Sequence, residues 1–427
     1  MGSLLAAGIL CSFLFFACSD DAPTIPGATS KVEGRVTDDI GFDALAKSMG
    51  NVEGAAVTIA RVQSDGSLLT VSNDTVFTDA NGQFLVETDA DGERGLIVVA
   101  TKGTDVWRAL ISAELKQGTT IRCQPLNDET TLEADIYLSV VENGLTDLVY
   151  YTDIAPNIDT DVANMLSGNA GAVDELTAAF EAKAGAHSGI LNDTTIGGTE
   201  SQLEALVIAR MQAQASLEAA LLQAENQAAI DAAFDQFNEA AVNAYAESGL
   251  SLAACATARE VSAKALLKNT ASLSSELQFG LNQMAARLRA FAVDRAVQAS
   301  FADLGATEGV SVAGAVLRTS VSGASNIAQI ETAFADYHDT IIDGMQNVSG
   351  DNAAAILTID TAINASAGAK LILDATVSAA ITTDALVDAY AAYISATRTL
   401  VEGTLSGANS TEVEAISNII VLVNLQV

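Results

Sequence analysis

The chain of 427 residues contains two histidines, His187 and His338, and this limits the chemistry that it can perform. A metal site on a helix needs ligands three or four residues apart, and the residues at those offsets from His338 are apolar. His187 comes just before Gly189, at an expected helix end where the helix dipole favours a cation. The histidines therefore predict neither a zinc site nor a Ser-His-Asp triad.

The sequence also lacks the patterns that position a nucleophile or a phosphate group. It contains no G-x-S-x-G elbow, no P-loop and no dinucleotide fingerprint. Paired carboxylates could hydrolyse a glycoside, but carboxylates on an acidic helical surface without aromatic platforms are typical of a solvated face. We therefore expect a protein that is not an enzyme and that needs no cofactor.

Calcium is the best inorganic candidate. Glu87, Asp89, Asp91 and Gly92 have the spacing of the first half of an EF-hand loop, but Val98 stands where that loop needs a bidentate Glu. A full EF-hand is therefore excluded. An ion bridging Asp89 and Asp91 is a weak candidate, and a plain hairpin turn is the alternative.

An uncharged apolar run from Leu4 to Ala17 ends directly before Cys18. The run is too short to span a bilayer and has the length of a secretory signal. With the following Cys it resembles the signal of bacterial lipoproteins, in which that Cys is acylated and becomes the N-terminus. The resemblance implies a signal peptide over 1–17, a lipid at Cys18 and attachment to a membrane; a plain secretory signal is the alternative.

The residues after this cysteine concern the side of the membrane on which the protein lies. Ser19-Asp20-Asp21 resembles the acidic tag of surface-exported lipoproteins in Bacteroidota-type bacteria. It favours an outer membrane lipoprotein exposed at the cell surface, with a periplasm-facing protein as the alternative. In this oxidising compartment Cys123 and Cys255 could form a disulfide, but we expect two buried free thiols.

The chain is strongly acidic, with 54 acidic against 20 basic residues and a formal charge of −34. Nucleic acid is therefore not an expected partner, because binding phosphate backbones depends on clusters of Lys and Arg. Such a charge keeps an exposed protein soluble. A hydrophobic content of 49% lets a chain of this length bury real cores, and the length suggests two to three domains.

Residues 18–30 lack periodicity and are expected to form a tether. Residues 31–127 contain short segments in which β-branched apolar residues alternate with polar ones, which is typical of strands. Seven such segments predict an antiparallel β-sandwich. They are 32–37, 55–62, 69–78, 83–88, 96–101, 106–113 and 119–124.

Four motifs in this region resemble a known family: 32–36 (VEGRV), 52–57 (VEGAAV), 78–84 (TDANGQF) and 98–103 (VVATKG). They are similar to carboxypeptidase regulatory-like domains, which are transthyretin-like (prealbumin-like) sandwiches. The resemblance implies a structural or accessory module with no catalytic residues to transfer. The insert between residues 37 and 51 departs from the family pattern.

Residues 128–427 have the 3.6-residue period of amphipathic helices and predict an all-α domain, either a bundle or stacked hairpins. Capping-box signatures mark three expected helix starts, and glycines mark the expected breaks. The signatures are Thr130 with Glu133, Ser201 with Glu204 and Thr411 with Glu414; closing or breaking glycines are Gly144, Gly189, Gly249, Gly305, Gly350 and Gly407.

Large apolar residues recur in this helical part at intervals of 46 to 56 residues. They are Phe180, Phe234, Leu288, Phe334 and Tyr390. The spacing predicts about five helical hairpins, each with one anchor on its buried face; the alternative is a chance match among Ala-rich helices.

The export signal, the accessory sandwich and the acidity together predict a lipid-anchored cell-envelope or surface protein with a structural or adhesive role. The alternative is a ligand-binding lipoprotein that captures a small molecule, peptide or glycan for an envelope transporter. The sequence does not identify the partner, which could be a protein or a glycan.

Overall fold

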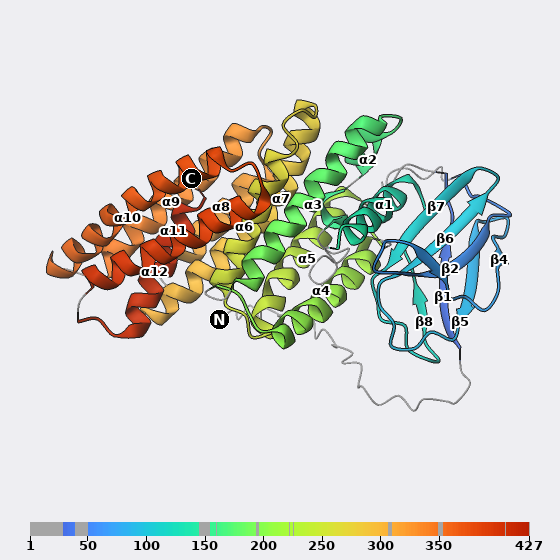
Figure 1. Cartoon of the computed structure of the whole chain (residues 1–427), viewed down its shortest axis with the longest axis horizontal. Coiled ribbons are helices and arrows are strands. Elements are labelled where there is room, and N and C mark those ends of the chain that lie inside the picture. The colour runs from blue at the N-terminus through green and yellow to red at the C-terminus, as the bar shows by residue number, and fades with distance from the viewer. Residues whose placement is uncertain are drawn as a thin grey trace, which may run out of the picture.

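The computed structural model describes residues 29–38, 50–144, 154–158, 160–193, 196–221, 223–224, 226–305, 310–348, 353–405 and 407–426. The predicted signal peptide, Cys18, the tether up to residue 28 and most of the insert lie outside these residues. The described chain begins with eight strands and continues in helices, so the mixed β plus α class is confirmed (Figure 1).

The strands form two sheets. One has the order β5-β1-β8, with β8 parallel to β1, and the other has the order β3-β2-β6-β7, with β4 also paired to β2. The bounds are β1 (Ser30–Arg35), β2 (Ala56–Val62), β3 (Leu68–Thr70), β4 (Val76–Phe77), β5 (Gln83–Thr88), β6 (Leu96–Lys102), β7 (Asp105–Ile111) and β8 (Thr120–Arg122).

The expected strand at 69–78 is divided into β3 and β4. Between them Asn73 donates its N–H to the carbonyl of Glu87 in β5, and Ser72 bridges to Thr88 in the same strand. The chain therefore leaves β2 for the edge of the other sheet and then returns, which interrupts the ladder.

Strand β6, inside the five-stranded sheet, is buried on both of its faces. Along β6, Val98 belongs to an apolar cluster shared with Val32 and Val86 of the other sheet, whereas Ile97 belongs to a cluster with Ile136 and other helical side chains. Three layers result: the three-stranded sheet, the five-stranded sheet and the helices. Burial on both faces explains the uninterrupted apolar run of β6.

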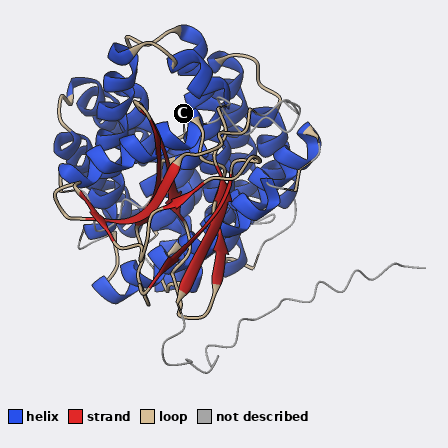
Figure 2. Cartoon of the chain, turned by 90° about the vertical axis from the view of Figure 1, so that its right-hand side faces the viewer, coloured by secondary structure: helices blue, strands red, loops and turns tan. Residues whose placement is uncertain are grey.

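The helices extend from this β unit (β1–β8) and form the other end of the molecule, with α9–α12 farthest from the strands (Figure 1). Figure 2 looks along the molecule from the β end, with the strands in front of the helices. The bounds are α1 (Asp128–Glu142), the 3-10 helix η2 (Ala155–Asn157), α2 (Thr160–Leu166), α3 (Ala170–Asn192), α4 (Glu200–Leu221), α5 (Gln227–Glu247), α6 (Leu252–Lys268), α7 (Ser275–Asp303), α8 (Val310–Ser322), α9 (Ile327–Val348), α10 (Ala353–Ala379), α11 (Thr383–Thr404) and α12 (Ser410–Asn424).

The expected helix starts are wrong by two or three residues, and in two of the three helices asparagine takes the capping position. Asn127 caps α1, so that Thr130 is the third helical residue and not the cap. Asn409 caps α12 in a capping box with Glu412, and α4 begins at Glu200.

Glycines with positive φ lie directly after α1, α5 and α7, where the sequence predicts helix ends. They are Gly144, Gly249 and Gly305. Gly189 is different, because it lies inside α3, where its Cα packs against Val387 of α11 at a distance that leaves no room for a Cβ. The expected break there is wrong.

Consecutive helices lie side by side at six places: α4 with α5, α6 with α7, α7 with α8, α8 with α9, α10 with α11 and α11 with α12. Of the five expected anchors, Phe180, Phe334 and Tyr390 are buried, whereas Phe234 and Leu288 are partly buried. The five anchors lie on α3, α5, α7, α9 and α11. Repetition of one helical hairpin stays a prediction.

Candidate functional site

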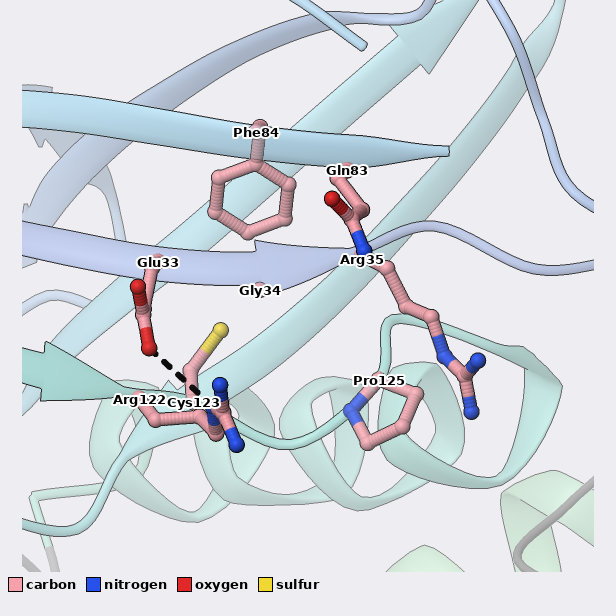
Figure 3. A pocket seen from close by; sticks show the side chains of 8 residues that line it. All are labelled: Glu33, Gly34, Arg35, Gln83, Phe84, Arg122, Cys123 and Pro125. Carbon is pink, nitrogen blue, oxygen red and sulfur yellow. Dashed lines mark hydrogen bonds and ion pairs between the residues drawn. The ribbon is translucent and has the colours of Figure 1, made fainter. Parts of the chain in front are cut away.

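A cavity of about 330 Å³ lies on the three-stranded sheet. Figure 3 shows the Phe84 ring and the Cys123 sulfur directed toward Gly34, with the side chains of Arg122 and Arg35 on either side of Pro125. The lining residues are Glu33, Gly34, Arg35, Gln83, Phe84, Arg122, Cys123 and Pro125.

A bulge after β8 shapes this cavity. Cys123 donates its N–H to the carbonyl of Glu33, and the next backbone bond runs from Leu126 to Arg35. Three residues on the β8 side therefore match two on the β1 side, and the extra residue bends the strand. Pro125 suits this position because it has no N–H to leave unpaired.

Gly34 is the position on β1 that leaves room between the two neighbouring strands. A Cβ there would lie 2.5 Å from the sulfur of Cys123 and 2.7 Å from the ring of Phe84. Both side chains are buried. They belong to the apolar cluster between the sheets and line the cavity together with a polar rim of Glu33, Arg35 and Arg122.

The charges of the rim do not cancel. Arg122 donates from Nε to Glu33 Oε1 at 3.1 Å, across the parallel pair of β1 and β8. The β unit has five arginines, and four of them form an ion pair with a carboxylate: Arg61, Arg94, Arg108 and Arg122. Within the described part of the chain Arg35 forms none, so the rim carries one excess positive charge.

Cys123 is not suited to act as a nucleophile in this cavity. Burial raises the pKa of its thiol well above the usual range, and the nearby Glu218 carboxylate raises that pKa further. The thiolate is the reactive form of cysteine, so the group remains a neutral thiol. Cys123 and Cys255 are both buried and free, which confirms the expectation for them.

A buried polar cluster connects the β unit to the helices. The Glu218 carboxylate in α4 accepts hydrogen bonds from Ser112 just after β7, from Gln124 in the bulge at 3.0 Å, and from Gln214 at 3.3 Å. All four side chains are buried. The same bulge that forms the cavity thus places Gln124 against the helical layer.

His187 and His338 both lie inside helices. His187 Nε2 is 2.6 Å from the hydroxyl of Tyr245, and both side chains are buried. The expected place of His187 at a helix end is wrong, since α3 continues to Asn192. His338 lies between Asp339 and Asn424, at 3.0 and 3.1 Å.

The two aspartates of the weak calcium candidate accept hydrogen bonds from different loops. Asp89 accepts from the side chain of Asn73 at 3.2 Å, and Asp91 accepts from the N–H of Gln117 at 3.0 Å. In the parts of the chain that the structure covers, no group of three or more His, Cys, Asp or Glu could hold a metal ion. A calcium ion at this turn stays a prediction.

Exposed apolar side chains of the helices are concentrated toward the C-terminal half. Five large ones in the described helices and turns are more than half exposed, and they come from α8, from α10 and from the turn after α10. They are Val312, Val316, Leu371, Ile372 and Ile381. The α8 pair lies in a hollow of about 410 Å³ with Ser311, Ala315, Thr319 and Ser320.

Comparisons of the chain with protein-family models, with curated proteins and with solved structures give no match. Within the described residues, no helix combines the length and apolar character that crossing a membrane requires. The function of the chain must therefore be argued from its own residues.

Sequence reasoning missed the cavity and the Glu218 cluster. The strand motif 32–36 contains Glu33, Gly34 and Arg35, but Arg122 is 89 residues from its partner Glu33. The pairing depends on the parallel register of β1 and β8, for which the sequence holds no local signal.

Proposed function

We propose that the chain is a lipid-anchored protein of the bacterial cell envelope, held in the outer membrane through Cys18, with a structural or adhesive role. The observation that carries the proposal is the Leu4–Cys18 sequence, which has the order of apolar run, small residue and cysteine that lipoprotein processing requires. The arrangement of the described residues supports it.

The short segment between Cys18 and the first described strand favours the β unit as the end nearer the anchor. Thr29, the first described residue, is eleven positions after Cys18, and eleven residues span at most about 40 Å when fully extended. We therefore place the β unit near the lipid and the helices farther from it. The exposed apolar side chains of α8 and α10 lie in that projecting part, where such a surface is typical of protein contacts.

The β unit is proposed to be a prealbumin-like sandwich of the carboxypeptidase regulatory-like kind, serving as a base for the helices. Two sheets that share one apolar cluster support this assignment. Buried contacts of Ser112 and Gln124 with Glu218 fix the base to the helical part.

Metabolic labelling with radioactive palmitate in the producing bacterium tests the anchor. Wild type and a Cys11→Ser variant should incorporate label, and Cys18→Ser should not, because Cys11 lies inside the cleaved signal. Globomycin should block processing of the first two. Equal labelling of Cys18→Ser would exclude the lipid anchor at this residue.

Protease treatment of intact and lysed cells tests the exposed position. A surface protein is degraded in both samples, whereas a periplasm-facing protein is protected in intact cells. Protection would remove the adhesive role and favour the second candidate function, capture of a small molecule, peptide or glycan for an envelope transporter. The cavity beside Arg35 is the feature that favours this second function.

A further inference from the structure

We propose that the cavity between Arg35 and Arg122 binds the oxyanion of a small ligand, a carboxylate or a phosphate ester of about monosaccharide size. The inference concerns binding chemistry alone and does not depend on the lipid anchor.

The register of the strands brings the two guanidinium groups to one cavity. Arg122 is opposite Glu33 in the parallel pair, and Arg35 is two residues farther along β1. With strands about 4.8 Å apart and a rise of about 3.3 Å per residue, the two Cα atoms are roughly 8 Å apart. Figure 3 shows the two guanidinium groups on either side of Pro125, and side chains as long as arginine could swing to reach one anion placed between them.

The charge of the rim favours an anion. Glu33 engages Nε of Arg122, which leaves the terminal nitrogens of that guanidinium available. Arg35 has no carboxylate partner within the described residues, in contrast to the other four arginines of the β unit. A planar guanidinium with free donors binds carboxylate and phosphate oxygens in a bidentate manner.

The lining and the volume define the rest of the ligand. The cavity is also lined by Phe84, Cys123 and Pro125, which are buried, and low-dielectric surroundings strengthen the attraction between charges. Gln83 adds an amide that can donate to or accept from a hydroxyl. About 330 Å³ is at the small end of ligand sites, which fits one sugar-sized molecule.

Isothermal titration of the full chain with glucuronate, with glucose 6-phosphate and with neutral glucose tests the proposal. Saturable binding of one or both anions, without binding of glucose, is the expected result, and the two anions distinguish a carboxylate from a phosphate ligand. Arg35→Gln should weaken that binding at least tenfold, and Arg122→Gln should weaken it as well.

Arg61→Gln is the matched control, because Arg61 is paired with Glu93 on the other sheet and away from the cavity. It removes the same charge and should leave the affinity unchanged. Circular dichroism of each variant shows whether the fold is kept. No saturable heat with either anion, or equal weakening in Arg35→Gln and Arg61→Gln, would overturn the proposal.

Discussion

The substitution Glu218→Ala tests whether the buried polar cluster holds the β unit against the helices. Glu218 is the common acceptor for Ser112, Gln124 and Gln214. Removing its carboxylate takes away one buried charge and three hydrogen bonds at once. Two of these bonds join the two parts of the molecule.

The magnitude follows from the burial of the donors. A hydrogen bond to a charged group contributes about 1.5–3 kcal/mol, and a buried donor left without its acceptor costs about 1–3 kcal/mol. Because the three bonds share one acceptor, their contributions do not add fully. We expect Glu218→Ala to lower the free energy of unfolding by about 3–5 kcal/mol.

Urea unfolding followed by two probes measures this loss. Trp107, the single tryptophan, lies in β7 and reports on the β unit, while circular dichroism at 222 nm reports on the helices. Glu204→Ala is the control, because it removes an exposed glutamate from the same helix and should cost less than about 0.5 kcal/mol. If the two variants unfold at the same urea concentration, the cluster does not stabilise the molecule and the reasoning fails.

Three further predictions concern Gly34 at the cavity and the buried thiol of Cys255. Gly34→Ala should lower the free energy of unfolding by about 1–3 kcal/mol, because the added methyl group overpacks against Cys123 and Phe84. Gly280→Ala, in open space on α7, should raise it by about 0.5–1 kcal/mol. Thermal unfolding measures both changes, and an equal shift of the melting temperature in the two variants would contradict the close contact at Gly34. Burial raises the pKa of Cys255 to about 12 from 9.0, so its thiolate forms more readily in the unfolded chain, and stability should fall as the pH rises above about 9. Mapping by mass spectrometry should find Cys255 unmodified by iodoacetamide at pH 8 until urea is added, and modification of the folded protein would refute its burial.

The strands were predictable because their pattern is local. β2, β5 and β6 lie within one residue of the expected segments, since alternation and turn residues specify them without reference to the rest of the chain. Helix starts were less predictable. The sequence patterns placed a Ser or Thr at the N-cap, whereas the N-caps of α1 and α12 are Asn127 and Asn409.

The cavity and the polar cluster were not predictable from local pattern. Ser112 and Glu218 are separated by 106 residues and Gln124 and Glu218 by 94. In the sequence Glu218 looks like one more acidic residue of a solvated helix face. Only the packing of α4 against the β unit turns that face inward, and this packing depends on contacts distant along the chain.

The parallel pairing of β1 with β8 determines how the molecule resists a pull between its N-terminus and its helices. Force would enter β1 at Ser30 and leave β8 at Arg122 toward α1, at opposite ends of the pair because the two strands point the same way. The hydrogen bonds between them are then sheared together instead of being opened one after another. A protein held at one end and pulled at the other would thus yield only when the whole ladder breaks.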